Sequence, residues 1–256
     1  MSAHEVRIEA CVNSVESAIE AEAGGANRVE LCDNLFDGGT TPSFGAIEAA
    51  RGALGIDLNV IIRPRGGDFL YSDLELDIMK ADVVAARTAG ANGVVFGILK
   101  ADGSVNVEQS QELVELAEPM STTFHRAFDM CADPLVALED LIALGIDRVL
   151  TSGQRPSAQE GASLIRKLVD EARGRITIMP GVGIDETNIA ELIGLTDARE
   201  FHVLAERPVE SDMVFRNPAV FMGTDPEQPE FERPVCDAGA VRAIVDAAAT
   251  LRRQDQ

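Results

Sequence analysis

The stretch Gly24-Gly-Ala-Asn-Arg-Val-Glu-Leu-Cys32 joins the end of a helical pattern to a short strand pattern. Similar junctions recur as Gly90-Ala-Asn-Gly93 and Gly145-Ile-Asp-Arg148. In each of them a glycine suits the left-handed backbone conformation that often ends a helix. Because one junction repeated along a chain indicates one repeated structural unit, the sequence predicts a series of helices that each lead into a strand.

Working outward from these junctions, we find eight units of a strand followed by a helix. The strand patterns cover residues 6–12, 28–33, 59–64, 93–99, 122–128, 148–152, 176–179 and 200–205. Eight such units in 256 residues are typical of a (β/α)8 barrel of the TIM type, which we assign to residues 1–256 as a single domain. A doubly wound sheet usually has fewer strands and a linker or second domain, and the sequence shows neither.

The segment 206–235 breaks the repeat, because it carries five prolines and no clear periodicity. It is longer than an ordinary connection between a strand and a helix. We therefore predict an insertion between the eighth strand and the last helix, on the C-terminal face where barrels of this type carry their sites. A lid and a contact between subunits are the roles we expect for it.

The amino-acid composition argues against two classes of binding partner. Lys and Arg number 22 against 43 Asp and Glu, which gives a formal net charge of −21. Nucleic-acid binding needs a basic face, and anionic membrane surfaces attract basic segments, so neither partner is expected. The sequence has no apolar run of about 18 residues and no signal-peptide pattern. We expect a cytoplasmic protein whose four cysteines are thiols.

Two strand patterns carry the same polar face. The pattern R-x-E-x-C occupies residues 7–11 and again residues 28–32, with apolar residues at the alternate positions. Since side chains alternate between the faces of a strand, the apolar face should meet the helices and the polar face should line the barrel. We expect the arginines to pair with Glu9 and Glu30, whose alternative roles are structural ion pairing or acid–base chemistry.

Further polar residues fall near the ends of other strand patterns, where the functional face of a barrel lies. Arg63 and Arg65 adjoin a Gly-Gly loop, which suits a carboxylate or phosphate ligand but is also compatible with a tight turn. In the fifth strand we place His125 inward, because Asp129 then shares its face if the strand stays extended. The complete candidate set adds Arg126, Ser152, Gly181, Gly183 and His202, the last of which has the alternative role of a core histidine.

Several motifs resemble the CutC family, which is described as a family of copper homeostasis proteins. They are Glu9-Ala-Cys11, Asn27-Arg-Val-Glu-Leu-Cys32, Gly38-Gly-Thr-Thr-Pro-Ser43, Ile62-Arg-Pro-Arg-Gly-Gly-Asp-Phe69, Thr123-Phe-His-Arg-Ala-Phe-Asp129 and Leu150-Thr-Ser-Gly153. The resemblance runs from about residue 5 to about residue 250 and implies a single TIM-type barrel. It also implies that Cys11 and Cys32 are copper(I) ligands, which agrees with the preference of copper(I) for soft thiolates. The alternative is that each is a small buried apolar residue.

Two hypotheses for the function follow. The first is a cytoplasmic copper(I)-binding protein, with Cys11 and Cys32 as the metal ligands. The second is an enzyme of the isomerase or lyase type that acts on a small phosphorylated or carboxylated sugar-like substrate. In it, arginines 63, 65 and 126, with Ser152 and the 181–183 turn, would bind the anion. Glu9, Glu30 or His125 would act as the general acid or base, and His202 or Asp129 would orient it. Under either hypothesis we expect a homo-oligomer, a dimer or a tetramer.

Overall fold

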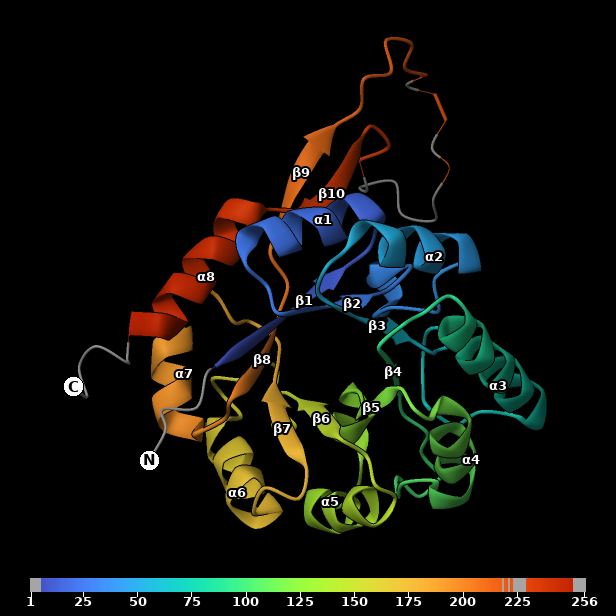
Figure 1. Cartoon of the computed structure of the whole chain (residues 1–256), viewed down its shortest axis with the longest axis vertical. Coiled ribbons are helices and arrows are strands. Elements are labelled where there is room, and N and C mark those ends of the chain that lie inside the picture. Colours follow the sequence, from blue (N-terminus) through green and yellow to red (C-terminus); the bar gives the residue numbers. More distant parts are fainter. Residues whose placement is uncertain (1–5, 218, 221, 223–228, 251–256) are drawn as a thin grey trace.

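Eight parallel strands curl into a nearly closed barrel, which confirms the predicted TIM-type architecture (Figure 1). The computed structural model describes residues 6–217, 219, 220, 222 and 229–250. The strand order is β7-β6-β5-β4-β3-β2-β1-β8, and a parallel bridge between Gly181 and His202 connects the ends of β7 and β8. The strands are β1 (Arg7–Val12), β2 (Arg28–Leu31), β3 (Asp57–Ile61), β4 (Gly93–Phe96), β5 (Ser121–Phe124), β6 (Arg148–Thr151), β7 (Thr177–Pro180) and β8 (Glu200–Val203).

Helices alternate with these strands and surround the barrel (Figure 1). They are α1 (Val15–Gly24), α2 (Phe44–Ala53), α3 (Asp73–Thr88), α4 (Val107–Ala117), α5 (Pro134–Ala143), α6 (Ala162–Ala172), α7 (Ile189–Thr196) and α8 (Ala238–Thr250). The expected junction chemistry is present: Gly25 ends α1 with a φ of 95°, in the left-handed region that glycine tolerates. The repeated junction therefore reflects repeated helix ends.

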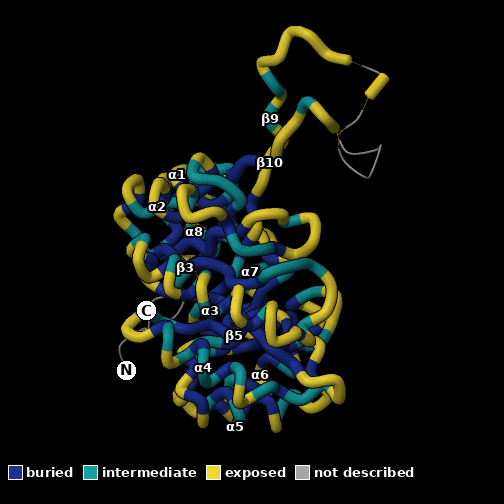
Figure 2. The backbone as a smooth tube through the Cα atoms, turned by 90° about the vertical axis from the view of Figure 1, so that its right-hand side faces the viewer, coloured by how far each residue is buried: buried dark blue, intermediate teal, exposed yellow. Residues whose placement is uncertain are grey.

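The main apolar core lies between the outer faces of the strands and the helices. On β1, Ile8, Ala10 and Val12 are each at most 1% exposed and belong to this core. Figure 2 shows the buried chain concentrated in the middle of the molecule, with exposed chain around it. The alternate residues of β1 are thereby left to face the barrel interior, as the period-two pattern predicted.

The fifth strand ends earlier than predicted. It stops at Phe124, and a short 3-10 helix, η2 (Arg126–Met130), follows with His125 as its N-cap. The expectation that an extended strand places His125 and Asp129 on one face is therefore wrong. The chain turns because the His125 Nδ1 accepts a hydrogen bond from the Ala127 N–H, and the Asp129 carboxylate accepts from backbone N–H groups that follow β6.

The predicted insertion begins and ends as a two-stranded antiparallel ribbon. Its strands are β9 (Glu206–Glu210) and β10 (Glu232–Cys236), and they project beyond the ring of helices (Figure 1). Both strands contain the sequence Glu-Arg-Pro-Val, and Pro208 lies opposite Pro234. Proline is tolerated here because no third strand needs its missing N–H. Residues 218, 221 and 223–228 of the insertion lie outside the described residues.

Within the described part of the chain, no helix has the length and apolar character needed to cross a bilayer.

Candidate functional site

Strand register determines which polar side chains meet in the barrel. Glu9 on β1 lies opposite Arg28 on β2, and Cys11 lies opposite Glu30. The two R-x-E-x-C patterns are thus offset by two residues, a stagger that barrel closure requires. On its other side, Glu9 lies opposite His202 of β8. The stagger therefore brings a glutamate, an arginine and a histidine to one level of the barrel.

Glu9 is the acceptor at the centre of this level. It is 1% exposed, and its carboxylate accepts hydrogen bonds from Arg28 Nε and, at 3.2 Å, from Asn59 Nδ2. His202 Nδ1 lies 2.8 Å from Glu9 Oε1. Burial raises the pKa of Glu9, but the charge of Arg28 and the hydrogen bond of His202 outweigh burial and leave that pKa at about 2. Glu9 is therefore an ionised group that orients its neighbours.

Asn59 on β3 belongs to this group, although the sequence analysis did not single it out. It is fully buried, and its Oδ1 has no hydrogen-bond partner among the described residues. The sequence does contain a sign of this role, because Asn59 is a polar residue in a strand pattern that is otherwise apolar up to Arg63. A buried amide in such a strand usually has a polar partner.

His202 connects Glu9 to Glu30. Its Nε2 lies 3.6 Å from Glu30 Oε2, on the opposite side of the ring from Glu9. Burial lowers the pKa of His202, but hydrogen bonds to Cys11 and Glu9 and the charge of Glu30 raise it well above its usual value. Burial raises the pKa of Glu30 to about 8, with the charges of Cys11 and Glu9 adding to the effect. The pKa of Glu9 is thus lowered and that of Glu30 raised, so Glu30 keeps its proton to a higher pH than Glu9 does.

Cys11 and Cys32 bring their sulfur atoms together above this level. The two Sγ atoms are 3.9 Å apart, and no disulfide joins them. Cys32 is 2% exposed, whereas Cys11 is partly exposed. The hydrogen bond between the thiols lowers the pKa of Cys11 and raises that of Cys32. One sulfur is therefore poised to be a thiolate, the form that binds metals.

Among the described residues, two sets of side chains present ligand atoms within 4.8 Å of one another, and both sets contain Glu30. One consists of Cys11, Glu30 and Cys32, and the other of Glu9, Glu30 and His202. The first set offers two soft sulfur donors, which fit copper(I). In the second set Glu9 is already engaged by Arg28, so its main effect is to orient His202.

The predicted arginine partners are confirmed in part. Arg28 pairs with Glu9 and, through Nη2 at 2.6 Å, with Glu200 at the start of β8. Arg7 does not pair with a glutamate of the interior: it is 43% exposed and pairs with Asp57 at 3.1 Å. Arg7 begins β1, at the N-terminal end of the barrel and away from the polar interior.

The candidate anion-binding arginines have partners within the chain. Arg63 is 4% exposed and donates to the carbonyl oxygens of Asp37, Gly39 and Gly67 at 2.6, 2.7 and 2.9 Å, so it ties together the loops after β2 and β3. Arg65 is 38% exposed and pairs with Glu75 of α3 at 2.5 Å.

His125 lies close to Arg63. Its ring contacts Phe69, with centroids 5.0 Å apart, and Arg63 lies over the same phenyl ring. Because Nδ1 accepts from Ala127, the ring proton lies on Nε2, a buried atom without a partner in the described residues. Burial, with the nearby charges of Arg63 and Arg126, lowers the pKa of His125 to about 3, so it is neutral.

Asp129, Arg126 and Ser152 form a third group that holds the end of β6. Asp129 pairs with Arg126 Nε at 2.9 Å and accepts from the Ser152 hydroxyl at 3.0 Å. Of the neighbours His125 and Arg126, the histidine is the buried one, as expected, and the arginine is 45% exposed.

The two candidate glycines after β7 lie in different surroundings. Gly181 contacts His202 at the barrel closure, while Gly183 faces Ser157.

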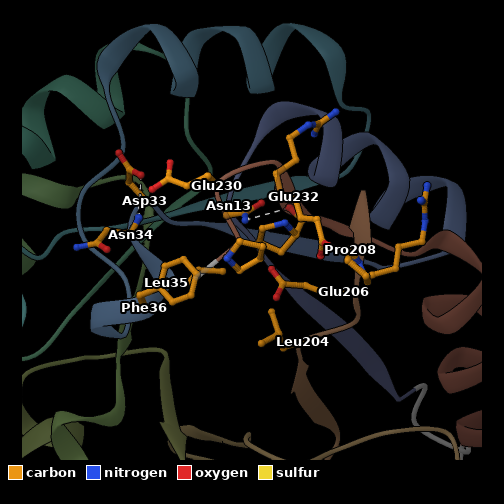
Figure 3. Close-up of a pocket in the computed structure, with 14 residues that line it drawn as sticks. Asn13, Asp33, Asn34, Leu35, Phe36, Leu204, Glu206, Pro208, Glu230 and Glu232 are labelled. Atoms are coloured by element: carbon orange, nitrogen blue, oxygen red, sulfur yellow. Dashed lines mark hydrogen bonds between the residues drawn. The ribbon is translucent and has the colours of Figure 1, made fainter. Parts of the chain in front are cut away.

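A cleft of about 830 Å³ opens between the ribbon and the loops after β1, β2 and β8 (Figure 3). Figure 3 shows Asn13, Asp33 and Leu204 around it, the residues that closely follow those three strands. Burial and then the charge of Cys11 raise the pKa of Glu206, another lining residue. The lining of this cleft includes Asn13 and Asp33, which closely follow Cys11 and Cys32 in the chain, but neither cysteine itself.

The fold and site together define a (β/α)8 barrel with paired thiols at its mouth. The sequence profile described as the CutC family matches residues 6–207, and the chain belongs to this family. The copper homeostasis protein cutC homolog of Mus musculus is 49% identical over 237 residues, covering 93% of this chain and 87% of the mouse protein. A family protein CutC of Chromobacterium violaceum is 51% identical, covering 94% and 97%. The crystal structure of a CutC protein from Streptococcus agalactiae has a TM-score of 0.74 and 35% identity, covering 77% of this chain and 98% of that chain.

Proposed function

We propose that this protein binds copper(I) in the cytoplasm through Cys11 and Cys32 and contributes to copper homeostasis. The observation that carries the proposal is the 3.9 Å separation of the two sulfur atoms at the mouth of the barrel. Thiolates are the ligands that copper(I) prefers, and the lowered pKa of Cys11 favours that form. The names of the mouse and human relatives, which are copper homeostasis proteins, support the same role.

A competitive titration tests this proposal. Reduced protein is titrated with copper(I) in the presence of a chromophoric copper(I) chelator, beside the double variant Cys11→Ser/Cys32→Ser. The matched control is Cys131→Ser/Cys236→Ser, since both of these cysteines are buried thiols outside the site. We expect one tightly bound copper(I) per chain in the wild type and in the control, and none in the double variant. Weak binding, or binding that survives in the double variant, contradicts the proposal.

A small anionic ligand, bound by an isomerase or lyase type of enzyme, is the second candidate, and one specific observation favours it. Of the buried donors that lack an acceptor in the described residues, three belong to one group: His125 Nε2, Arg63 Nε and the Tyr71 hydroxyl. Arg63 is the neighbour common to them, because its charge affects the pKa of both His125 and Tyr71. A carboxylate or phosphate oxygen of a sugar-like substrate would satisfy such donors.

Thermal shift measurements with phosphorylated and carboxylated sugars test the second candidate. A ligand that stabilises the wild type and the Cys11→Ser/Cys32→Ser variant, but not Arg63→Lys, supports it. Stabilisation that survives Arg63→Lys contradicts it, as does a complete absence of stabilising ligands in the series. Lysine is the chosen replacement because it keeps the charge but loses the guanidinium fork.

We also propose that the protein is a homo-oligomer, a dimer or a tetramer. The ribbon insertion exposes apolar side chains that a subunit contact would cover, including Val214 at 99% and Phe215 at 76% exposure. Light scattering of the full chain tests this, and a mass equal to one chain contradicts it. The double variant Val214→Ser/Phe215→Ser should shift the mass toward that of one chain.

A further inference from the structure

Glu30 has a carboxylate oxygen for which the protein supplies no partner. The residue is 3% exposed, and its Oε1 accepts no hydrogen bond from the described residues. Its other oxygen, Oε2, lies 3.6 Å from His202 Nε2. A buried oxygen left unpaired is destabilising, so its retention inside a barrel calls for an explanation. Metal coordination is one explanation, because a carboxylate oxygen of Glu30 lies within 4.8 Å of both sulfur atoms.

The sulfur separation is compatible with a bent pair of thiolate ligands. A metal–thiolate bond is about 2.3 Å long, so two sulfurs in line with a metal would be about 4.6 Å apart. The observed separation of 3.9 Å corresponds instead to an angle near about 115° at a metal with such bonds. An angle of this size leaves room for a third ligand, and it is close to the angles of tetrahedral coordination. The Cys11 and Cys32 sulfurs can therefore accommodate a third ligand without first moving apart.

The nature of the third ligand then determines the class of metal. Carboxylates are hard ligands that copper(I) does not favour, whereas zinc-class divalent ions accept thiolate, imidazole and carboxylate together. When bound, two thiolates and the Glu30 carboxylate carry three negative charges, of which a divalent ion cancels two and copper(I) only one. His202, held by Glu9 at 2.8 Å, is the neighbouring imidazole on the other side of Glu30.

We infer that Cys11, Cys32 and Glu30 form a binding site for a zinc-class divalent cation, with Glu30 Oε1 as the third ligand. The inference rests on the two thiols of the proposed function, and it adds a ligand and a class of metal. Glu30 is the selective element, because the thiols serve copper(I) and divalent ions alike.

Cobalt(II) provides a spectroscopic probe of this site, since thiolate ligation to cobalt gives absorption bands and zinc then competes for the same position. Reduced, metal-free full-length protein is titrated with cobalt(II), and then with zinc(II) against a chromophoric chelator. We expect one cobalt(II) per chain with thiolate absorption, displaced by one zinc(II). No thiolate absorption, or zinc(II) binding no tighter than that of the Cys11→Ser/Cys32→Ser variant, overturns the inference.

The Glu30→Gln variant tests the third ligand. We expect its zinc(II) affinity to fall by at least about tenfold, while its copper(I) affinity changes by less than about threefold. Glu206→Gln is the matched control, because Glu206 lies close to Cys11 but outside the sets of ligand atoms. An unchanged zinc(II) affinity in Glu30→Gln, or an equal loss in Glu206→Gln, overturns the assignment.

X-ray absorption of zinc-loaded wild type keeps the test decisive if Glu30→Gln does not fold. The expected first shell contains two sulfur atoms together with oxygen or nitrogen, whereas a shell of sulfur alone overturns the role of Glu30. The outcomes also separate the two proposals. Zinc(II) binding without tight copper(I) binding contradicts the proposed function alone, and tight copper(I) binding without zinc(II) binding contradicts this inference alone.

Discussion

Glu9 on β1 pairs with Arg28 on β2, the residue two positions before its counterpart in the repeated motif. Both side chains are buried, at 1% and 3% exposure, and Arg28 also holds Glu200. The ion pair therefore fixes the stagger between the first two strands and, through Glu9, the position of His202. Cys11 lies one level higher on β1, and Cys32 directly follows β2, so the position of the candidate metal site depends on this pair.

The Arg28→Met substitution should be strongly destabilising. It leaves the Glu9 carboxylate buried without its main counter-charge, which in other proteins costs about 3–5 kcal/mol. Urea unfolding at pH 7 measures the free energy, and the double variant Glu9→Gln/Arg28→Met should recover part of the loss. As a control, Arg175→Met breaks an exposed pair with Glu139 and should cost less than about 1 kcal/mol. Equal losses at the two sites would contradict this account.

His125 should make the stability depend on pH. Its pKa in the folded protein is lowered to about 3, chiefly by burial, whereas the unfolded chain has the usual value near 6.5. Between these values the unfolded state binds the proton and the folded state does not, so stability is lost as pH falls below about 6.5. The contribution is about 1.4 kcal/mol for each pH unit in this window.

The His125→Asn variant isolates this effect. Asparagine has no titratable group, and its side-chain oxygen can still accept the Ala127 N–H as an N-cap. Unfolding free energies measured between pH 6.5 and 4.5 should therefore fall less steeply in the variant than in the wild type. Parallel curves would show that His125 is not buried in the neutral form.

Asp129 should contribute more to stability than an ordinary capping residue. Its carboxylate accepts from the Thr151 hydroxyl at 2.5 Å, from the N–H and hydroxyl of Ser152 and from the Gln154 N–H. Asp129→Ala leaves several of these donors unpaired, and we expect a loss of about 3 kcal/mol or more in thermal or urea unfolding.

Asp133→Ala is the matched control for this prediction. Asp133 caps α5 through the Leu135 and Val136 N–H groups on the surface, and loss of such a cap costs about 1 kcal/mol. If the two variants lose the same free energy, the Asp129 group does not hold the end of β6 as described.

Local patterns were sufficient to predict the barrel. The glycine junctions, the alternation in β1 and β2 and the Asp133-Pro134 helix start all depend on nearest neighbours in the chain, and each is present in the structure. The ribbon was not predicted, because its two proline-containing strands lack a clear periodicity. Each is stabilised by pairing with the other.

The sequence predicted which side chains belong to the candidate site better than it predicted how those side chains pair. Inward alternation identified Glu9, Glu30, Cys11 and Cys32, but the two-residue stagger that pairs Glu9 with Arg28 is a property of barrel closure. The turn after Phe124 was also missed, since Asp129 is drawn to backbone N–H groups of a distant loop. Arg63 likewise meets carbonyl groups of loops that no local pattern could place.

The most direct test of the central claim is X-ray absorption on the reduced protein loaded with one equivalent of copper(I). The account predicts a first shell with two sulfur ligands, which is lost in the Cys11→Ser/Cys32→Ser variant and retained in Cys131→Ser/Cys236→Ser. A first shell without sulfur, or one that is unchanged when Cys11 and Cys32 are replaced, would contradict the claim that these two thiols bind copper(I).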